Sequence, residues 1–93
     1  MKLTFQPRVP ADLRWFKRYF GEGTEAAINK YYKTLDLICA SPGMGRPVSE
    51  RDAREYAILR IPFSIIYRVK VDRIEVLRVW DQRADRVSLW EKA

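Results

Sequence analysis

Arginine is the residue type with the clearest chemical potential in the C-terminal half of the sequence. Its guanidinium group presents a planar fork of donors that suits phosphate and carboxylate oxygens. Tyrosine and tryptophan occur between the arginines, and their rings could stack on bases or pack against a partner helix. The pattern predicts a surface that binds an anionic partner. The cationic residues are Arg54, Arg60, Arg68, Lys70, Arg73, Arg78, Arg83 and Arg86, and the aromatic ones are Tyr56, Tyr67 and Trp80.

The same residues also have a purely structural interpretation. The arginines could form a solvated sheet face in which they pair with Glu55, Asp72 and Glu75. Tyr67 shares the apolar face of its predicted strand, so it is expected in the core. Trp80 could lie either at the edge of the core or on the contact surface.

Other kinds of chemistry have few candidate residues. The chain contains no histidine, which is the commonest general base and metal ligand at neutral pH. Cys39, the only cysteine, falls in a helical apolar pattern and is expected in the core, so a multi-cysteine zinc site is excluded. We find no phosphate-binding loop and no nucleophile beside a base. We therefore expect no metal and no cofactor, and any catalysis would depend on Arg, Lys, Tyr or carboxylates.

Length and charge set the broad class. A chain of 93 residues closes only one core, which predicts a single domain over residues 1–93. The net charge of +6 favours nucleic acid, an acidic protein segment or the ribosome as partner, although the same excess could simply maintain solubility. A membrane-spanning helix needs about 20 apolar residues, and no apolar run in the sequence approaches this length. The first ten residues lack a signal-peptide pattern. We expect a cytoplasmic protein with no membrane partner.

The first half of the chain has the spacing of two helices. Residues 2–6 alternate in polarity and suit a short strand. After Pro10, apolar residues at helical spacing predict a helix that ends at the glycines 21 and 23. Thr24 is the predicted N-cap of a second helix, and Ser41-Pro42-Gly43 ends it. Two helices with so short a connection should form an antiparallel hairpin.

The second half has the spacing of strands. Residues 44–53 are rich in Gly, Pro, Ser and charge and are interpreted as a loop. Residues 54–61, 63–71 and 74–80 are rich in β-branched and aromatic side chains and predict an antiparallel meander, with turns at Pro62 and Asp72-Arg73. Asp85 could cap a short terminal helix that makes apolar contacts through Val87 and Trp90.

The alternation along the strands predicts which residues face the helices. In the central strand these are Phe63, Ile65, Tyr67, Val69 and Val71. In the last strand a two-residue turn would place Val76, Arg78 and Trp80 on the core side, whereas a slip of one residue would place Glu75, Leu77 and Val79 there. Neither set is wholly apolar, so the register of the last two strands stays open.

Several consecutive segments resemble the RelE/ParE toxin superfamily of type II toxin-antitoxin systems. They are Gly45-Arg46-Pro47-Val48, Arg54-Glu55, the run from Ile61 to Val69, and the run from Val76 to Asp85. The resemblance implies an α+β fold in which an N-terminal helical hairpin packs on an antiparallel sheet of three to four strands with a short C-terminal helix. Residues 2–6 would join this sheet at an edge.

The resemblance implies one of two activities. RelE-type members cleave mRNA on the ribosome. They have an arginine in the central strand that would fall on Ser64 here, and serine cannot stabilise an anion as arginine does. Their terminal helix presents a tyrosine or histidine, where this chain has Leu89 and Trp90. ParE-type members inhibit DNA gyrase without hydrolysis, and their last strand ends in a histidine where this chain has Asp81. Arg83 alone matches without change.

We therefore expect a ParE-like toxin that arrests growth by binding DNA gyrase, serves plasmid stabilisation, and is neutralised by a cognate antitoxin. The expected partner-binding residues are Arg60, Arg68, Arg78, Trp80 and Arg83. One alternative is a ribosome-dependent mRNA endoribonuclease that uses Arg54, Arg60 and Arg83 electrostatically, with Lys70 or Tyr56 moving protons. The other is a degenerate toxin that only binds antitoxin.

Overall fold

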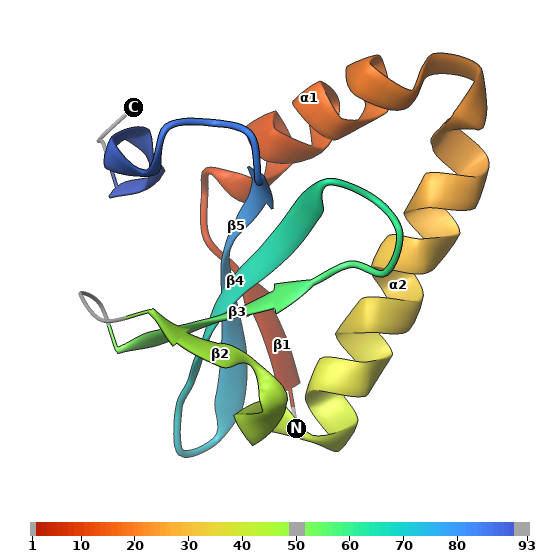
Figure 1. The fold of residues 1–93 in the computed structure, drawn as a ribbon. Coiled ribbons are helices and arrows are strands. Elements are labelled where there is room, and N and C mark those ends of the chain that lie inside the picture. Colours follow the sequence, from red (N-terminus) through yellow and green to blue (C-terminus); the bar gives the residue numbers. More distant parts are fainter. Residues whose placement is uncertain (1, 49–51, 91–93) are drawn as a thin grey trace.

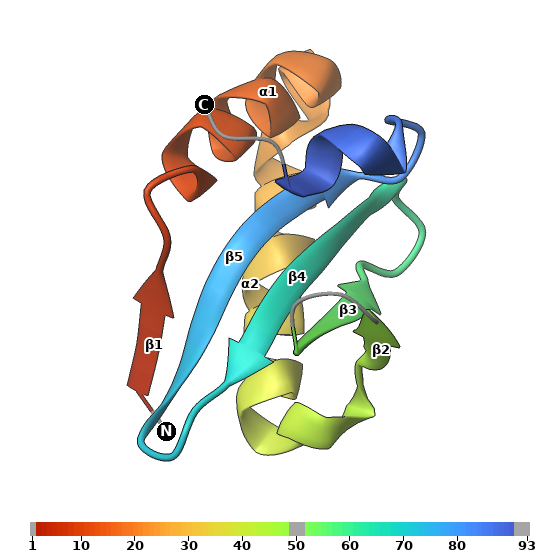
Figure 2. The same ribbon diagram turned by 90° about the vertical axis from the view of Figure 1, so that its left-hand side faces the viewer.

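The computed structural model describes residues 2–48 and 52–90, apart from the side chains of residues 87 and 88. Figure 1 shows a sheet with two helices on one side, and Figure 2 shows the C-terminal turn against the opposite face. In chain order the elements, with η for a 3₁₀ helix, are β1 (Lys2–Phe5), α1 (Val9–Phe20), η1 (Gly21–Gly23), α2 (Thr24–Ala40), η2 (Pro42–Met44), β2 (Arg46–Val48), β3 (Ala53–Ala57), β4 (Phe63–Val69), β5 (Arg73–Asp81) and η3 (Arg86–Trp90).

The five strands form one mixed sheet in the order β1-β5-β4-β3-β2. The predicted meander of β3, β4 and β5 is confirmed, and so is the edge strand at the N-terminus, which pairs parallel with β5. The interpretation of residues 44–53 as a loop is wrong for β2, which pairs with β3. Three residues that include Pro47 carry no periodic signal, because this strand is defined by its partner rather than by its own sequence.

The two helices form the predicted hairpin, whose arms diverge from η1 (Figure 1). Gly21 ends α1 with a positive φ of 54°, a conformation that favours glycine. The prediction that Thr24 is an N-cap is wrong. Its hydroxyl donates to the carbonyl oxygens of Lys17 and Gly21 at 3.1 and 2.6 Å. It therefore hydrogen-bonds carbonyl groups at the C-terminus of α1 rather than N–H groups at the start of α2.

The main core lies between the helices and one face of the sheet. Phe63, Ile65 and Tyr67 of β4 are fully buried in it, as predicted. Val69 and Val71 are exposed, because β4 ends at Val69. Cys39 is half-buried against this core. The helical residues of the core are Val9, Phe16, Ala27, Tyr31, Leu35 and Ile38.

A β-bulge in β5 explains why neither predicted residue set was apolar. Tyr67 pairs with Val76 and Ile66 pairs with Arg78, which leaves Leu77 without a partner in β4. An extra residue shifts the alternation of side chains. Val76 and Val79 therefore both face the helices, although neither predicted set contained this pair.

The opposite face of the sheet carries a second, smaller core that the C-terminal turn covers. Leu89 of η3 is 2% exposed and packs against Ile66, Leu77 and Trp80. The predicted terminal helix is thus present as a 3₁₀ turn, directly after Asp85. The predicted contact of Val87 lies outside the described side chains.

Two turns differ from their predicted positions. The first meander strand ends at Ala57, and Arg60 in the following turn has a positive φ of 65°. The second turn is centred on Val71 and Asp72, one residue earlier than expected, because Lys70 N–H donates to the Arg73 carbonyl at 2.8 Å. Within the described residues, neither helix is long and apolar enough to cross a membrane.

Candidate partner-binding site

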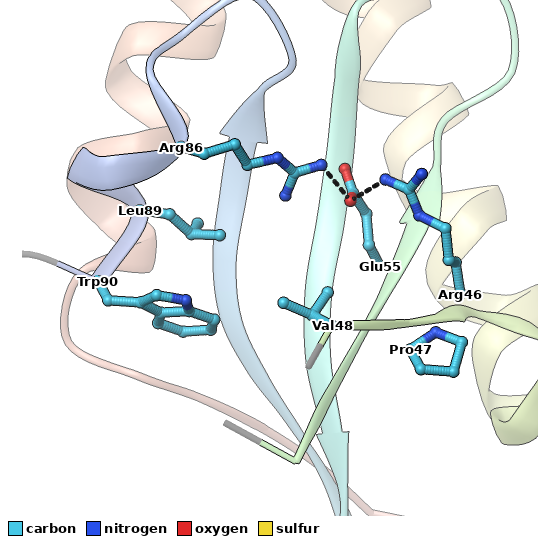
Figure 3. Close-up of a pocket in the computed structure, with 7 residues that line it drawn as sticks. All are labelled: Arg46, Pro47, Val48, Glu55, Arg86, Leu89 and Trp90. Atoms are coloured by element: carbon cyan, nitrogen blue, oxygen red, sulfur yellow. Dashed lines mark hydrogen bonds and ion pairs between the residues drawn. The ribbon is translucent and has the colours of Figure 1, made fainter. Parts of the chain in front are cut away.

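A groove crosses the face of the sheet that the helices leave uncovered (Figure 3). One part has a volume of about 350 Å³ between β2 and η3. A second part of about 590 Å³ extends toward the end of β5 and shares Arg46, Glu55 and Arg86 with the first. The first part is lined by Arg46, Pro47, Val48, Glu55, Arg86, Leu89 and Trp90.

Glu55 lies at the centre of this groove and is only 6% exposed. Its Oε1 accepts hydrogen bonds from Nη2 of Arg46 at 2.7 Å and from Nη2 of Arg86 at 2.6 Å. Burial alone would raise its pKa, but hydrogen bonds from Arg86, Arg46 and Ser64 outweigh burial and hold the pKa below its ordinary value. Glu55 is therefore an ionised hydrogen-bond acceptor at neutral pH, and the lowered pKa makes it a weak base.

Ser64 and Gln82 lie in the second part of the groove. The side-chain amide of Gln82 donates to Ser64 Oγ at 2.8 Å and to the Phe63 carbonyl at 3.3 Å. Ser64 is 1% exposed, so the position onto which the resemblance would place the arginine of RelE-type toxins holds a small, buried hydroxyl. Within the described residues, no three carboxylate or cysteine side chains gather closely enough to hold a metal ion.

Arg83 belongs to a separate cluster at the exit of β5, which we call the arginine–aromatic cluster (Trp15, Tyr19, Asp81 and Arg83). Arg83 donates Nε and Nη2 to the two Asp81 oxygens at 2.8 and 2.7 Å, and its guanidinium carbon lies 4.3 Å from the centre of the Tyr19 ring. Trp15 Nε1 donates to Asp81 Oδ2 at 3.2 Å. These hydrogen bonds, those from Arg83 foremost, lower the pKa of Asp81 to about 2.

Exposed side chains are rarely fixed in this way. Trp15 is 46% and Tyr19 43% exposed, and the Arg83 side chain is 51% exposed. Holding a flexible side chain in place costs conformational entropy, which the arginine–aromatic cluster has lost before any partner arrives. Trp, Tyr and Arg are also the residue types that most often dominate binding energy. The cluster thus has the composition of a contact surface, and its side chains already contact one another within the chain.

Arg78 and Trp80 have a different role from the predicted partner contact. Arg78 is 8% and Trp80 5% exposed. The Arg78 guanidinium donates to both Asp12 oxygens and to the Leu89 carbonyl, and it lies 5.0 Å from the Trp80 ring centre. Arg78 joins α1, β5 and η3 within the chain, and Trp80 packs in the smaller core with Leu89, so we do not retain either as a contact candidate.

Three further arginines were predicted site residues. Arg54 donates to the carbonyl oxygens of Gly43 and Gly45 at 3.1 and 2.7 Å and so holds the turn before β2. Arg60 is exposed in the turn between β3 and β4. Arg68 is half-buried and forms a long ion pair of 3.4 Å with Glu75. The structure therefore does not bring Arg54, Arg60 and Arg83 together around one point.

The residues that complete both sites did not stand out in the sequence. Arg46 was noted only within a segment of the resemblance, and Glu55 only within such a segment and as a charge partner of the arginines. Trp15 and Tyr19 lie beside the apolar stripe of the first predicted helix and were not singled out as site residues. Their positions four residues apart at the margin of that stripe are the signal that could have identified an exposed aromatic pair.

Comparisons with known proteins agree with the fold. The family model for the ParE toxin of the type II toxin-antitoxin system parDE matches residues 3–86. A solved structure described as the chromosomal ParDE TA system from P. aeruginosa is similar with a TM-score of 0.73 and 27% sequence identity, over 85% of this chain and 92% of that chain. No curated protein sequence matches. Since the family match covers almost every described residue, the chain belongs to the ParE toxin family of type II toxin-antitoxin systems.

Proposed function

We propose that this ParE family member arrests growth by binding DNA gyrase, and that a cognate antitoxin neutralises it by covering its contact surface. In this proposal the toxin binds and does not cleave. Loss of the antitoxin leaves free toxin, which is the basis of the plasmid-stabilising role expected from the sequence. Action on gyrase would take place in the cytoplasm.

The observation that carries this proposal is the environment of Ser64. A ribonuclease of this superfamily needs a cation beside the scissile phosphate, because negative charge accumulates there in the transition state. Ser64 Oγ instead accepts a hydrogen bond from Gln82 and supplies no positive charge at this position. This environment favours the binding activity over RNA cleavage.

The arginine–aromatic cluster is the proposed contact surface for the antitoxin. Its exposed rings supply apolar area, and Arg83 supplies a fixed cation for an acidic side chain. Arg14, Lys17 and Arg18 add positive charge on the neighbouring exposed face of α1. An antitoxin segment that is acidic and amphipathic would complement this surface. Arg60 and Arg68 stay as further candidates for contact with either partner.

A supercoiling assay tests the proposal. Purified toxin is mixed with gyrase, ATP and relaxed plasmid, and the appearance of supercoiled product is followed with and without the antitoxin encoded beside the toxin. We expect inhibition that equimolar antitoxin relieves. Ribosomes with bound message serve as the parallel sample. Full gyrase activity together with message cleavage would replace the proposal with the endoribonuclease alternative. If gyrase stays active and the message stays intact, the chain is a degenerate toxin.

A further inference from the structure

Among the described residues, the groove in Figure 3 holds more positive charge than its one carboxylate neutralises. Nη2 atoms of Arg46 and Arg86 both contact one oxygen of Glu55, at 2.7 and 2.6 Å. Two guanidinium groups and one carboxylate carry a formal charge of +2 − 1 = +1. Like charges repel, and a concave, partly desolvated site strengthens their field. The arrangement therefore favours the arrival of a second anion.

Both arginines keep donors for that anion. Each uses one Nη2 group on Glu55, and within the described residues their other guanidinium N–H groups have no hydrogen-bond partner. The Arg46 side chain is 71% and the Arg86 side chain 50% exposed, whereas that of Glu55 is 5% exposed. Glu55 thus holds the two guanidinium groups together from beneath and leaves them accessible from solvent.

The chemistry next to these arginines identifies the kind of ligand. Toward one end the groove is lined by the apolar side chains of Pro47, Val48 and Leu89, together with Trp90 (Figure 3). A peptide with an acidic residue beside an aliphatic one complements both parts of the groove. A nucleic acid strand requires cations spaced along its backbone, and the described part of the groove offers one pair, Arg46 and Arg86. The groove therefore suits a peptide better than a nucleic acid.

We propose that this groove binds an acidic side chain of the antitoxin, whose carboxylate bridges Arg46 and Arg86 while a neighbouring apolar side chain packs against Val48 and Leu89. The inference rests on the proposed neutralisation by antitoxin and adds a second contact, on a different face from the arginine–aromatic cluster. One antitoxin segment would then contact α1 and another would lie in the groove, on two different faces of the toxin.

Titration calorimetry of the purified toxin with the antitoxin encoded beside it tests this. Arg46→Ala and Arg86→Ala each leave Glu55 with one guanidinium partner, so the buried carboxylate stays paired and folding is retained, which a melting curve checks. We expect each variant to weaken binding by about tenfold or more. Arg73→Ala is the matched control, because Arg73 pairs with Asp72 and Glu75 at the far end of β5, and we expect a change below about twofold.

A double-mutant cycle then identifies the acidic residue. Each antitoxin Asp or Glu is changed to Asn or Gln, and one such change should weaken binding to the unaltered toxin while having little effect on Arg86→Ala. Equal affinities for the unaltered toxin and both arginine variants would overturn the groove site and leave the proposed function intact. Absence of binding by the unaltered toxin would overturn the proposed neutralisation instead. Binding of a short DNA duplex that depends on Arg86, with no effect on antitoxin affinity, would assign the groove to phosphate.

Discussion

Arg78 in β5 donates to both carboxylate oxygens of Asp12, which lies 66 residues earlier in α1, at 2.8 Å each. The side chains are 9% and 10% exposed. Asp12 also accepts the Val79 N–H at 3.0 Å, and Arg78 also donates to the Leu89 carbonyl at 2.6 Å. This ion pair therefore joins the first helix, the last strand and the C-terminal turn, the three elements that support both proposed contact surfaces.

Loss of Asp12 should be strongly destabilising. Asp12→Ala leaves the buried Arg78 guanidinium without its carboxylate, and breaking a buried pair from one side typically costs about 3–5 kcal/mol. We expect a fall of that size in the free energy of unfolding, measured by urea denaturation. Asp36→Ala on the exposed face of α2 is the control and should change it by less than about 0.5 kcal/mol. Similar stability for the two variants would show that Arg78 is adequately solvated without Asp12.

Gly45 should not tolerate a side chain. A Cβ atom there would contact the Tyr67 ring, with Cε1 and Cζ both at 2.9 Å, and Tyr67 is fully buried. The Tyr67 hydroxyl also accepts the Gly45 N–H at 3.0 Å and donates to the Pro42 carbonyl at 2.7 Å, so the ring cannot move without losing these bonds. We expect Gly45→Ala to destabilise the fold by about 1–3 kcal/mol in thermal unfolding.

Gly43→Ala is the matched control for this steric prediction. A Cβ atom at Gly43 would have no neighbour within 4 Å, and its φ is not in the left-handed region. Its melting temperature should equal or exceed that of the unaltered chain, since alanine reduces the entropy of the unfolded state. Equal melting temperatures for both alanine variants would contradict the close approach of Gly45 to Tyr67.

The Asp81 carboxylate should stabilise the fold only above acidic pH. Its pKa falls from 3.8 to about 2 on folding, chiefly through hydrogen bonds from Arg83. A lowered pKa means that the stabilisation is complete above the unfolded pKa and is lost as the pH falls through the folded one. The stability difference between the unaltered chain and Asp81→Asn should be constant from neutral pH to about 5, shrink below about 4 and be lost near 2.

Chemical unfolding at fixed ionic strength over this pH range checks the prediction. The lowered pKa of Glu55 makes both proteins acid-sensitive, so only the difference between them reports on Asp81. A difference that persists unchanged at pH 2 would mean that the stabilisation does not depend on the charge of Asp81.

Arg83 should contribute strongly to antitoxin affinity. The Arg83 side chain already contacts Asp81 and Tyr19, so a partner that pairs with its guanidinium group does not bear the entropy cost of ordering this side chain. We expect Arg83→Ala to weaken antitoxin binding by about tenfold or more in titration calorimetry. Arg73→Ala at the opposite end of β5 again serves as the control. Unchanged affinity of Arg83→Ala would remove the arginine–aromatic cluster from the antitoxin interface.

The sequence predicted the elements whose signal is local. The two helices, the three meander strands and the inward face of Phe63, Ile65 and Tyr67 follow from periodicity, and the structure agrees. The β-bulge at Leu77 could not be predicted in this way, because it is defined by pairing between strands.

The candidate sites were less accessible from the sequence for the same reason. Arg83 was identified from the resemblance, but its fixation depends on Tyr19, which is 64 positions earlier, and no spacing rule relates them. Glu55 meets Arg46 across a strand pair and Arg86 across the groove. Burial of Arg78 likewise depends on a carboxylate in the first helix. The density of arginines indicated a charged surface, but it did not indicate which arginines pair with groups inside the fold.

Plasmid topology in living cells tests most directly whether the toxin acts on gyrase. The toxin is induced from a controlled promoter in cells that carry a reporter plasmid, with and without the antitoxin encoded beside it, and growth and negative supercoiling are followed together. We predict that growth stops as supercoiling falls, and that the antitoxin restores both. Growth arrest with unchanged plasmid topology and cleaved message would contradict the account, as would normal growth without antitoxin.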